Sequence, residues 1–340
     1  LYHVLLFTLS KLDFKMQLER MSVHLFKRFC TRRSMGHIFC VSGTANETDN
    51  PACRLMSTGK HMDPLQYCMD SVRKYDYENF LSSLLLPDEC RGDVFAIRAF
   101  NIELAQIGLI TREPLAGMMR LEFWRETVSS LYEDRTVQQP VALRLHRAVK
   151  QHKLNKQWLR RLIDSREQLI NKAGFDTTEE LELYAEASNA SLYYLILQAA
   201  GIKSVDADHC ASHLGKGEGL LKVLRGVPFM ASRKQLMLPR QLMVEHGVSE
   251  EDVLRGCREQ KLKDLVFDVA SLANQHIQHS CELSAKVPDA AKVCLLPAVA
   301  AKLALARLQR ADFDIFDPRV SVRSNWLPIQ LWWAKFRRRL

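Results

Sequence analysis

Long hydrophobic runs are missing from this 340-residue sequence, although 47% of its residues are hydrophobic. Apolar stretches such as Ser191–Ile202 and Val293–Leu308 are short or are interrupted by Lys302. A membrane-spanning helix needs about 20 mainly apolar residues. The sequence therefore predicts a globular protein that contacts a membrane, if at all, only peripherally.

Motifs of metal and redox chemistry are equally scarce. The nine cysteines are scattered from Cys30 to Cys294 without a Cys-x-x-Cys pair. Neither a zinc site nor a disulfide framework is predicted, and the pattern indicates a reducing compartment. The chain also lacks a glycine-rich phosphate loop and a Ser-His-Asp arrangement of usable spacing. It therefore offers no motif for phosphate-loop or triad chemistry.

Acidic residues are absent from the segment Arg20–Asn46, in a chain whose formal net charge is +9. The net charge alone leaves open nucleic-acid binding, contact with an anionic membrane and a targeting segment. Within the segment, a basic helical face lies opposite an apolar one formed by Leu25, Phe26 and Phe29; the basic residues are Lys27, Arg28, Arg32 and Arg33. This pattern is typical of a mitochondrial presequence. An ordinary disordered basic tail is the alternative.

Three regions follow from these patterns. Because residue 1 is leucine, we expect residues 1–60 to comprise an over-extended start, with Met16 or Met21 as the true beginning, then the presequence and a linker, mostly disordered. Residues 61–317 are expected to form one domain. Residues 318–340 are expected to form an amphipathic tail rich in basic and aromatic residues.

The central region has the periodicity of helices. Apolar residues recur at intervals of three and four from Pro64 to Asp317, and strand-like alternation is scarce. Long helices are predicted over 94–105, 118–132 and 180–201, and prolines fit their starts or breaks at Pro87, Pro140, Pro239 and Pro297. The predicted fold class is all-α, in a single domain.

Three blocks of this region resemble the squalene/phytoene synthase family in order and spacing. The blocks are Tyr75–Asn101, Arg120–Leu143 and His213–Pro239. The resemblance covers about residues 64–316. It implies the isoprenoid-synthase fold, a bundle of helices around a deep central cavity.

Active members of that family carry two aspartate-rich helical motifs that face each other across the cavity. Their carboxylates hold Mg²⁺, which bridges to the diphosphate leaving group. Aspartates four residues apart share one helix face. In this chain Asn101 and Ala105 stand at the positions of the first pair, and Gly226 and Met230 stand at those of the second. The resemblance therefore implies a pseudoenzyme with no catalytic residue, no metal and no cofactor.

The remaining polar residues near these positions do not replace the lost ligands. Lys222 stands where an amide residue is expected four positions before Gly226, and Glu103 is a lone carboxylate on a different helix face from Asn101. We predict a vestigial pocket formed by Arg98, Asn101, Glu103, Lys222, Arg225, Gly226 and Met230. Arg98, Lys222 and Arg225 either hold an anionic head group or form structural ion pairs inside the bundle.

Other patterns with the spacing of functional motifs are better explained as ordinary surface residues. Asp264 and Asp268 lie beyond the second motif, and His209 and His213 have no third ligand at a usable spacing. The basic residues of segment 150–161 fit a solvated helix face better than a nucleic-acid patch. We therefore predict no nucleic-acid partner.

The lost motifs, the presequence and the segments 98–101, 206–209 and 312–316 narrow the resemblance to the complex I assembly factors of this family. This implies a peripheral protein on the matrix side of the mitochondrial inner membrane, which acts early, near mitochondrially encoded membrane subunits. Its partners would be complex I subunits or assembly intermediates. The alternatives are a lipid- or isoprenoid-binding module and an active head-to-head prenyltransferase.

The C-terminal tail combines tryptophan with arginine. If a helix begins at Pro328, its apolar residues form one stripe beside basic residues, a mixture that suits the headgroup boundary of an anionic membrane. The membrane-contact residues predicted on this basis are Trp326, Trp332, Trp333, Arg337, Arg338 and Arg339. A terminal helix docked on the bundle is the alternative.

Overall fold

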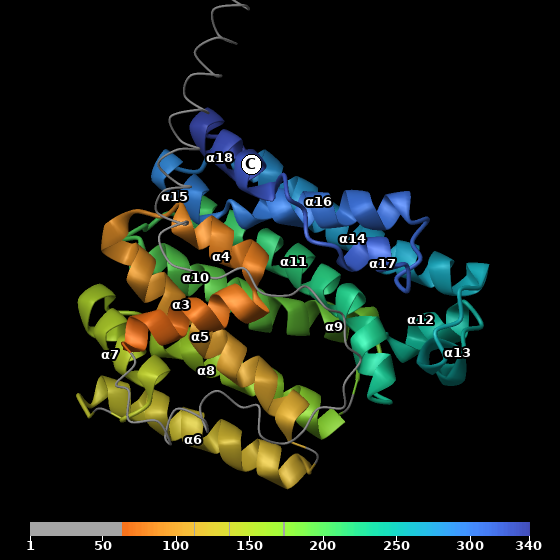
Figure 1. The fold of residues 1–340 in the computed structure, drawn as a ribbon, viewed down its shortest axis with the longest axis horizontal. Helices are drawn as coiled ribbons and strands as arrows, with labels where there is room; N and C mark the ends of the chain where they lie inside the picture. Colours follow the sequence, from red (N-terminus) through yellow and green to blue (C-terminus); the bar gives the residue numbers. More distant parts are fainter. Residues whose placement is uncertain (1–62, 112, 136, 173) are drawn as a thin grey trace, which may run out of the picture. The chain divides into compact units, whose positions relative to one another are not determined.

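The computed structural model describes residues 63–111, 113–135, 137–172 and 174–340. The predicted presequence and linker lie outside these residues. Within the described part the chain is helical, and no strand is present apart from one isolated bridge between Phe175 and Pro239. The all-α prediction is thereby confirmed (Figure 1).

The first part of the described chain, up to Lys172, forms six helices. They are α3 (Pro64–Tyr75), α4 (Tyr77–Leu84), α5 (Asp88–Ile110), α6 (Pro114–Tyr132), α7 (Pro140–His152) and α8 (Lys156–Lys172). Prolines begin several of them because the first helical turn needs no hydrogen bond from its N–H groups. The Asp63 carboxylate caps α3 by accepting from Leu65 N at 3.1 Å, and Gln139 caps α7 by accepting from Ala142 N at 2.7 Å.

The rest of the described chain contains its two longest helices, α11 and α14, and several shorter elements. They are α9 (Thr178–Ala185), η1 (Glu186–Ala190), α10 (Ser191–Ala199), α11 (Val205–Ser232), α12 (Arg240–Glu245), α13 (Glu250–Leu254), α14 (Gln260–Leu283), α15 (Asp289–Cys294), α16 (Pro297–Arg310), α17 (Pro318–Ser321) and α18 (Leu327–Arg337). The helix expected over residues 180–201 is thus divided by a π-helical turn, η1.

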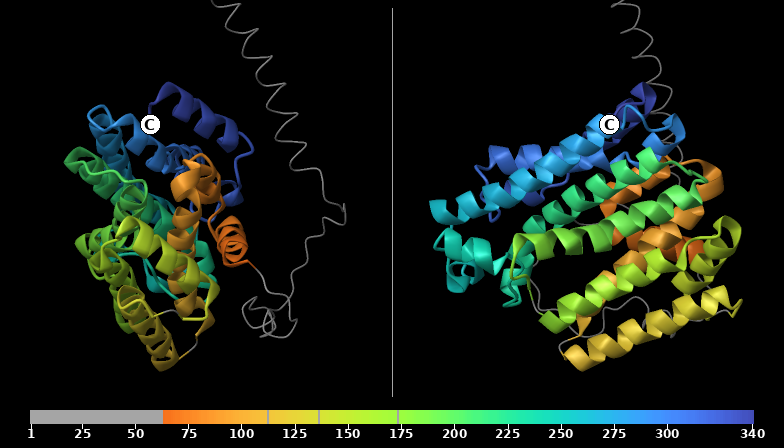
Figure 2. Two further views of the ribbon diagram at one scale, coloured as in Figure 1. Left: turned by 90° about the vertical axis from the view of Figure 1, so that its left-hand side faces the viewer. Right: turned by 180° about the vertical axis from the view of Figure 1, so that it is seen from behind.

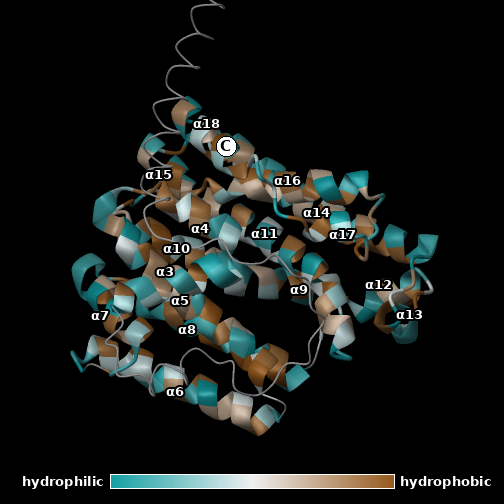
Figure 3. Cartoon of the chain, in the orientation of Figure 1, coloured by the Kyte–Doolittle hydropathy of each residue, from teal (hydrophilic) through white to brown (hydrophobic). Residues whose placement is uncertain are grey.

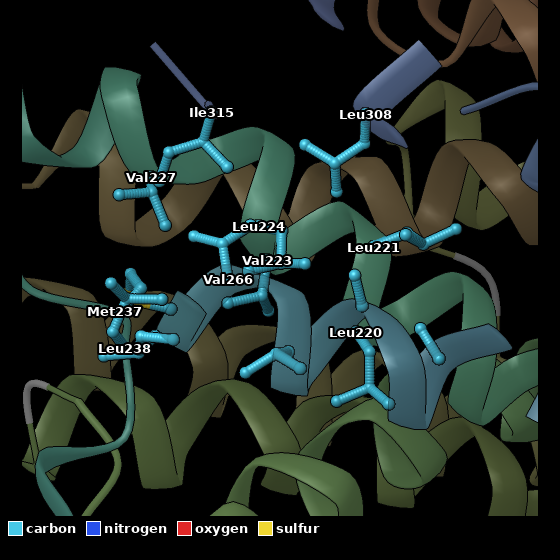
Figure 4. Close-up of a cluster of buried hydrophobic side chains, with 14 of the residues drawn as sticks. Leu220, Leu221, Val223, Leu224, Val227, Met237, Leu238, Val266, Leu308 and Ile315 are labelled. Atoms are coloured by element: carbon cyan, nitrogen blue, oxygen red, sulfur yellow. The ribbon is translucent and has the colours of Figure 1, made fainter. Parts of the chain in front are cut away.

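The long helix α11 crosses α14, and their apolar faces form much of one core cluster. Figure 4 shows Leu220, Leu224 and Val227 of α11 in this cluster with Val266 of α14 and Leu308 of α16. Most helices carry hydrophobic and hydrophilic residues side by side, as helices with one buried face do (Figure 3). Burial of these faces at about 25 cal/mol per Å² supplies the main force that holds the bundle together.

The C-terminal helix is docked on the bundle. Leu327 and Leu331 of α18 are buried in a second cluster with Ala300 of α16 and with Leu296, which immediately precedes α16. Residues 318–340, expected as a tail, are therefore part of the same helical unit as residues 63–317. No helix of the described chain has the length and hydropathy that crossing a membrane requires.

Candidate functional site

A cavity of about 650 Å³ is lined by residues of α4, α5, α8, α9, η1, α11 and the segment between α17 and α18. Part of its lining is polar or charged: Tyr75, Asp76, Tyr77, Glu78, Asn101, Arg166, Tyr184, Asn189, Lys222, Arg225 and Arg323. The remainder is largely apolar and includes Ile102, Leu104, Leu109, Leu169, Ile170, Val223, Phe229 and Met237. The cavity therefore combines cationic groups with an apolar surface.

The four positions at which the family resemblance places metal-binding aspartates line this cavity. Asn101 and Ala105 come from α5, while Gly226 and Met230 come from α11. Open space lies beside Gly226, where an added Cβ would meet no heavy atom within 4 Å. Mg²⁺ requires hard oxygen ligands, usually carboxylates. An amide, two small residues and a thioether do not provide them, so these residues do not fit the magnesium cluster of the synthases.

Asn101 is instead engaged by an arginine from α8. Its Oδ1 accepts a hydrogen bond from Arg166 Nη2 at 3.3 Å, and the Arg166 guanidinium also donates to the hydroxyl of Tyr184. The guanidinium carbon lies 5.5 Å from the centre of the Tyr184 ring. A cation therefore lies against the position where the family resemblance places an aspartate.

A second cation, the Lys222 ammonium, is held by an internal network. Lys222 Nζ lies 2.9 Å from Glu218 Oε1 and donates to Asn189 Oδ1 at 3.0 Å. Asn79 Nδ2 donates to the same Glu218 oxygen at 2.9 Å, and the Tyr193 hydroxyl donates to Glu218 Oε2. Glu218 is thus saturated by a charge and two hydrogen bonds, as a buried carboxylate must be.

These contacts determine the protonation of Glu218. Burial by itself raises the pKa of this carboxyl, but the charge of Lys222 and the hydrogen bond from Tyr193 outweigh it and lower the pKa to about 2. Arg98 and Asn79 add smaller contributions in the same direction. Glu218 therefore remains ionised near neutral pH and neutralises the Lys222 ammonium.

Arg225 is neutralised in a similar way. Its Nη1 lies 2.9 Å from Glu78 Oε2, and Arg307 Nη2 approaches the other Glu78 oxygen at 3.9 Å. The sequence left two roles open for Lys222 and Arg225, namely binding of an anionic head group and ion pairing inside the bundle. In the structure both residues form ion pairs with glutamates.

Two residues of the predicted vestigial pocket do not line the cavity. Arg98 is only 2% exposed; its Nη1 lies 3.8 Å from Asp76 Oδ2 and its guanidinium faces Tyr193 at 6.0 Å. Glu103 points toward α3, where its Oε1 accepts from the Tyr67 hydroxyl at 2.9 Å, and burial raises the pKa of its carboxyl. Both side chains belong to the packing around α5.

Several residues of the site were not identified from the sequence. Glu218 and Lys222 are four apart on one helix, a spacing that does predict an ion pair. By contrast, no sequence signal marks the residues that other segments bring to the cavity, namely Asp76, Arg166, Tyr184, Asn189 and Arg323, or Asn79, which contacts Glu218. Whether these residues lie at the site depends on how the helices cross.

The residues set aside as ordinary surface groups make local contacts. Asp268 pairs with His246 at 2.7 Å, and Asp264 accepts from Gln260 at 2.8 Å. His213 packs against His276, and burial, followed by the charges of neighbouring histidines, lowers its pKa to about 4. In the described chain no group of three or more His, Cys, Asp or Glu side chains is arranged to hold a metal ion.

The predicted membrane-contact residues occupy different environments. Trp326 is 69% exposed just before α18, Trp332 is partly buried, and Arg337 lies 4.4 Å from the centre of the Trp333 ring. Arg338 is engaged with Asp289 of α15 at 2.6 Å, whereas Arg339 is exposed. The outward face of α18 therefore combines aromatic rings with cations, while Arg338 also holds the helix to its neighbour.

Comparison with known proteins assigns the class. The squalene/phytoene synthase family model matches residues 72–326, and the chain belongs to this family. A solved dehydrosqualene synthase covers 81% of this chain and 95% of its own length, with a TM-score of 0.71 at 18% identity, which shows a shared fold.

Curated relatives are more specific. NADH dehydrogenase (ubiquinone) complex I assembly factor 6 of Rattus norvegicus is 43% identical over 273 residues, which is 80% of this chain and 82% of the relative. The protein of the same name from Homo sapiens is 42% identical over 272 residues, with the same coverage of both chains.

The ion pair between Lys222 and Glu218 gives a first prediction. Lys222→Met leaves the Glu218 carboxylate buried without its main cation and is expected to lower the free energy of unfolding at neutral pH by about 3 kcal/mol, the lower end for such losses because Lys222 is partly exposed. Lys263→Met, whose partner Asp312 is 74% exposed, is the control and should cost less than about 1 kcal/mol. Urea unfolding measures both.

The pH dependence separates charge pairing from lost packing. The folded pKa of Glu218, about 2, lies below the ordinary glutamate value of about 4.3. The stability it contributes is therefore present above the ordinary value and is lost as pH falls from there toward 2. The difference between the parent and Lys222→Met should narrow over this acidic window. A difference that stays constant with pH would mean that only packing was lost.

Proposed function

We propose that this chain is a non-catalytic assembly factor of mitochondrial respiratory complex I. One observation carries the proposal: the cavity retains its place in a synthase fold, yet Asn101, Ala105, Gly226 and Met230 stand where metal-binding carboxylates belong. The two relatives described above, each covering 80% of this chain, are named as assembly factors of that complex. A pocket without metal ligands suits binding better than diphosphate chemistry.

We further propose that the protein acts early in assembly, with complex I subunits or assembly intermediates as partners, near the mitochondrially encoded membrane subunits. Its proposed place is the matrix side of the mitochondrial inner membrane, in peripheral association. The basic segment Arg20–Asn46 and the names of the relatives support a mitochondrial location.

The outward face of α18 is the proposed membrane contact. Trp326, Ile329 and Phe336 are 69%, 40% and 66% exposed, and basic residues follow directly at the C-terminus. Tryptophan and phenylalanine insert at the headgroup boundary, while arginines interact with anionic lipid. The opposite face of α18, with Leu327 and Leu331, supports this surface by packing on the bundle.

Lipid or isoprenoid binding in the cavity is a second candidate function. The specific observation is its open volume: added Cβ atoms at Gly108 and Gly226 would meet no heavy atom within 4 Å. An apolar chain fits beside Ile102, Leu109 and Val223, and a polar head group fits toward Arg166. Such a ligand would be bound without metal.

Turnover by the purified protein tests the non-catalytic proposal. Incubation with a prenyl diphosphate and Mg²⁺ is expected to give no condensation product, and Mg²⁺ is expected to leave the Tm unchanged. The reason is the loss of all four carboxylates, since loss of a single ligand-supporting residue already costs about 10–100-fold in metal affinity or activity. A squalene or dehydrosqualene synthase serves as the positive control.

The contrary result is specific. Magnesium-dependent product formation that disappears in Glu103→Ala, although Glu103 contacts Tyr67 outside the cavity lining, would restore the enzyme hypothesis. Glu103→Ala should otherwise leave the other properties of the protein close to those of the parent.

A further inference from the structure

A second, shallow cleft lies between the C-terminal end of α3 and the segment that leads into α18. Its lining contains Asp70, Arg73, Lys74, Tyr77, Arg323, Ser324, Asn325 and Pro328. Three of these side chains are cationic and one is acidic. The cleft was not anticipated from sequence, because residues 70–77 and 323–328 are far apart along the chain.

The three cations of this cleft are not neutralised by ion pairs. Arg73, Lys74 and Arg323 are exposed and have no described carboxylate within ion-pair distance. Two of them lie over tyrosine rings instead: Lys74 Nζ is 4.8 Å from the centre of the Tyr75 ring, and the Arg323 guanidinium is 4.6 Å from that of Tyr77. Lys222 and Arg225, inside the cavity, are by contrast paired with glutamates. The cleft therefore retains its positive charge for an external anion.

The cleft lies on the same side of the helical unit as the aromatic face of α18. Pro328, in the first turn of α18, is part of its lining, and the neighbouring Trp326 and Ile329 are exposed. Tyr75, at the end of α3, is also 47% exposed. Figures 1 and 2 show α3 and α18 along one side of this unit. Cations and apolar side chains are therefore exposed on the same side of the helical unit.

The cleft also adjoins the cavity. Tyr77 and Arg323 are part of the lining of both. A phosphate held by Arg323 would therefore lie beside a cavity whose lining is partly apolar.

We propose that Arg73, Lys74 and Arg323 bind the phosphate of an anionic phospholipid headgroup and thereby orient the helical unit with α3 and α18 against the membrane. The proposal rests on the peripheral membrane location proposed above and names a lipid site for it. An anionic phospholipid, unlike a nucleic acid, supplies both partners that this surface requires: a phosphate for the cations and an apolar layer for Trp326 and Ile329.

Sedimentation with vesicles tests this site. The full chain is mixed with phosphatidylcholine vesicles with or without phosphatidylglycerol, and we expect strong retention only on the anionic vesicles. The double variant Arg73→Glu/Lys74→Glu should weaken that retention at least about tenfold, because each basic residue near an anionic surface contributes roughly fivefold in affinity. Equal melting temperatures of variant and parent establish that the fold is intact.

A control with the same change in net charge isolates the cleft. Lys156→Glu/Arg160→Glu alters α8, which lies on the side seen from behind in Figure 2, away from α3. This variant should retain anionic-vesicle binding within about twofold of the parent. If both double variants lose binding equally, net charge and not the cleft is responsible, and the proposal is wrong.

Three further arms give distinct outcomes. Inorganic phosphate competes for the same cations but should leave the protein on the anionic vesicles, because the membrane also binds Trp326 and Ile329; complete displacement by phosphate, but not by chloride at equal ionic strength, would identify a free-phosphate site and overturn the lipid proposal. Binding of an oligonucleotide that is lost in Arg73→Glu/Lys74→Glu, with vesicle binding unchanged, would overturn it in favour of a nucleic acid. Trp326→Ala/Phe336→Ala should weaken vesicle binding while leaving the preference for anionic lipid in place.

Failure of the lipid site is distinguishable from failure of the membrane location. If the parent protein binds neither kind of vesicle, both proposals are refuted. Binding that depends on Trp326 and Phe336 but not on Arg73 and Lys74 would refute the lipid site alone.

Discussion

Gly215→Leu is expected to abolish the native fold. A Cβ at this position would lie 2.4 Å from the backbone nitrogen of Ala190 and 2.5 Å from its Cα, so helix α11 would have to move away from η1. A Cβ added at Gly219, one turn later, would likewise lie 2.8 Å from the Cα of Ala185. Overpacking alone costs about 1–3 kcal/mol or more, and here the obstructing atoms are backbone. Against a total stability of about 5–15 kcal/mol, we expect little folded protein.

The measurement uses a matched substitution in the same helix. Gly215→Ala should lower the free energy of unfolding by about 3 kcal/mol or more. Gly226→Ala, which adds a Cβ in open space, should be neutral or stabilising by up to about 1 kcal/mol because alanine favours helix. Urea unfolding followed by circular dichroism compares the two. Equal effects would show that α11 does not pack against η1 as described.

Gly217 separates the two packing directions of α11. Its added Cβ would lie 2.6 Å from Ile277 Cγ1 and 2.9 Å from the carbonyl oxygen of Ala273, both on α14. Gly215 and Gly219 therefore face η1 and α9, respectively, and Gly217 faces α14. Three alternating glycines allow α11 to approach neighbours on both sides, and the cavity lies further along the same helix at Gly226.

Helix periodicity predicted the fold well where the helices are amphipathic. Pro140 and Pro297 begin α7 and α16 as expected, since their fixed φ suits the first turn. Local signals did not predict η1, because its wider turn is a feature of the packing against α11 and leaves no mark in apolar spacing. Nor did they predict that α11 continues past Pro228, which lies close enough to the end of the helix at Ser232 for few hydrogen bonds to be affected.

The site was predictable only along single helices. Spacing places Asn101 with Ala105 and Gly226 with Met230, because residues four apart share a face. Which helix face lines the cavity depends on the angles at which the helices cross. The sequence therefore does not predict that Arg166 of α8 contacts Asn101. The same limit applies to Glu103: sequence places it near the motif, and packing directs it to Tyr67.

Paired charges explain how the bundle keeps a partly polar cavity. Lys222 and Arg225 line this cavity and are balanced by Glu218 and Glu78. Glu218 is buried, and an unpaired buried charge is strongly destabilising. These ion pairs therefore stabilise the helices around the cavity.

Cells that lack this protein provide the most direct test of the central claim. We expect assembled complex I, quantified on native gels, to fall to a small fraction of its normal amount, while the other respiratory complexes and the isoprenoid products of the cell are largely spared. Re-expression of the parent or of Glu103→Ala should restore complex I, because no metal chemistry depends on that carboxylate. Intact complex I together with depletion of an isoprenoid product would contradict the assembly function and indicate a synthase.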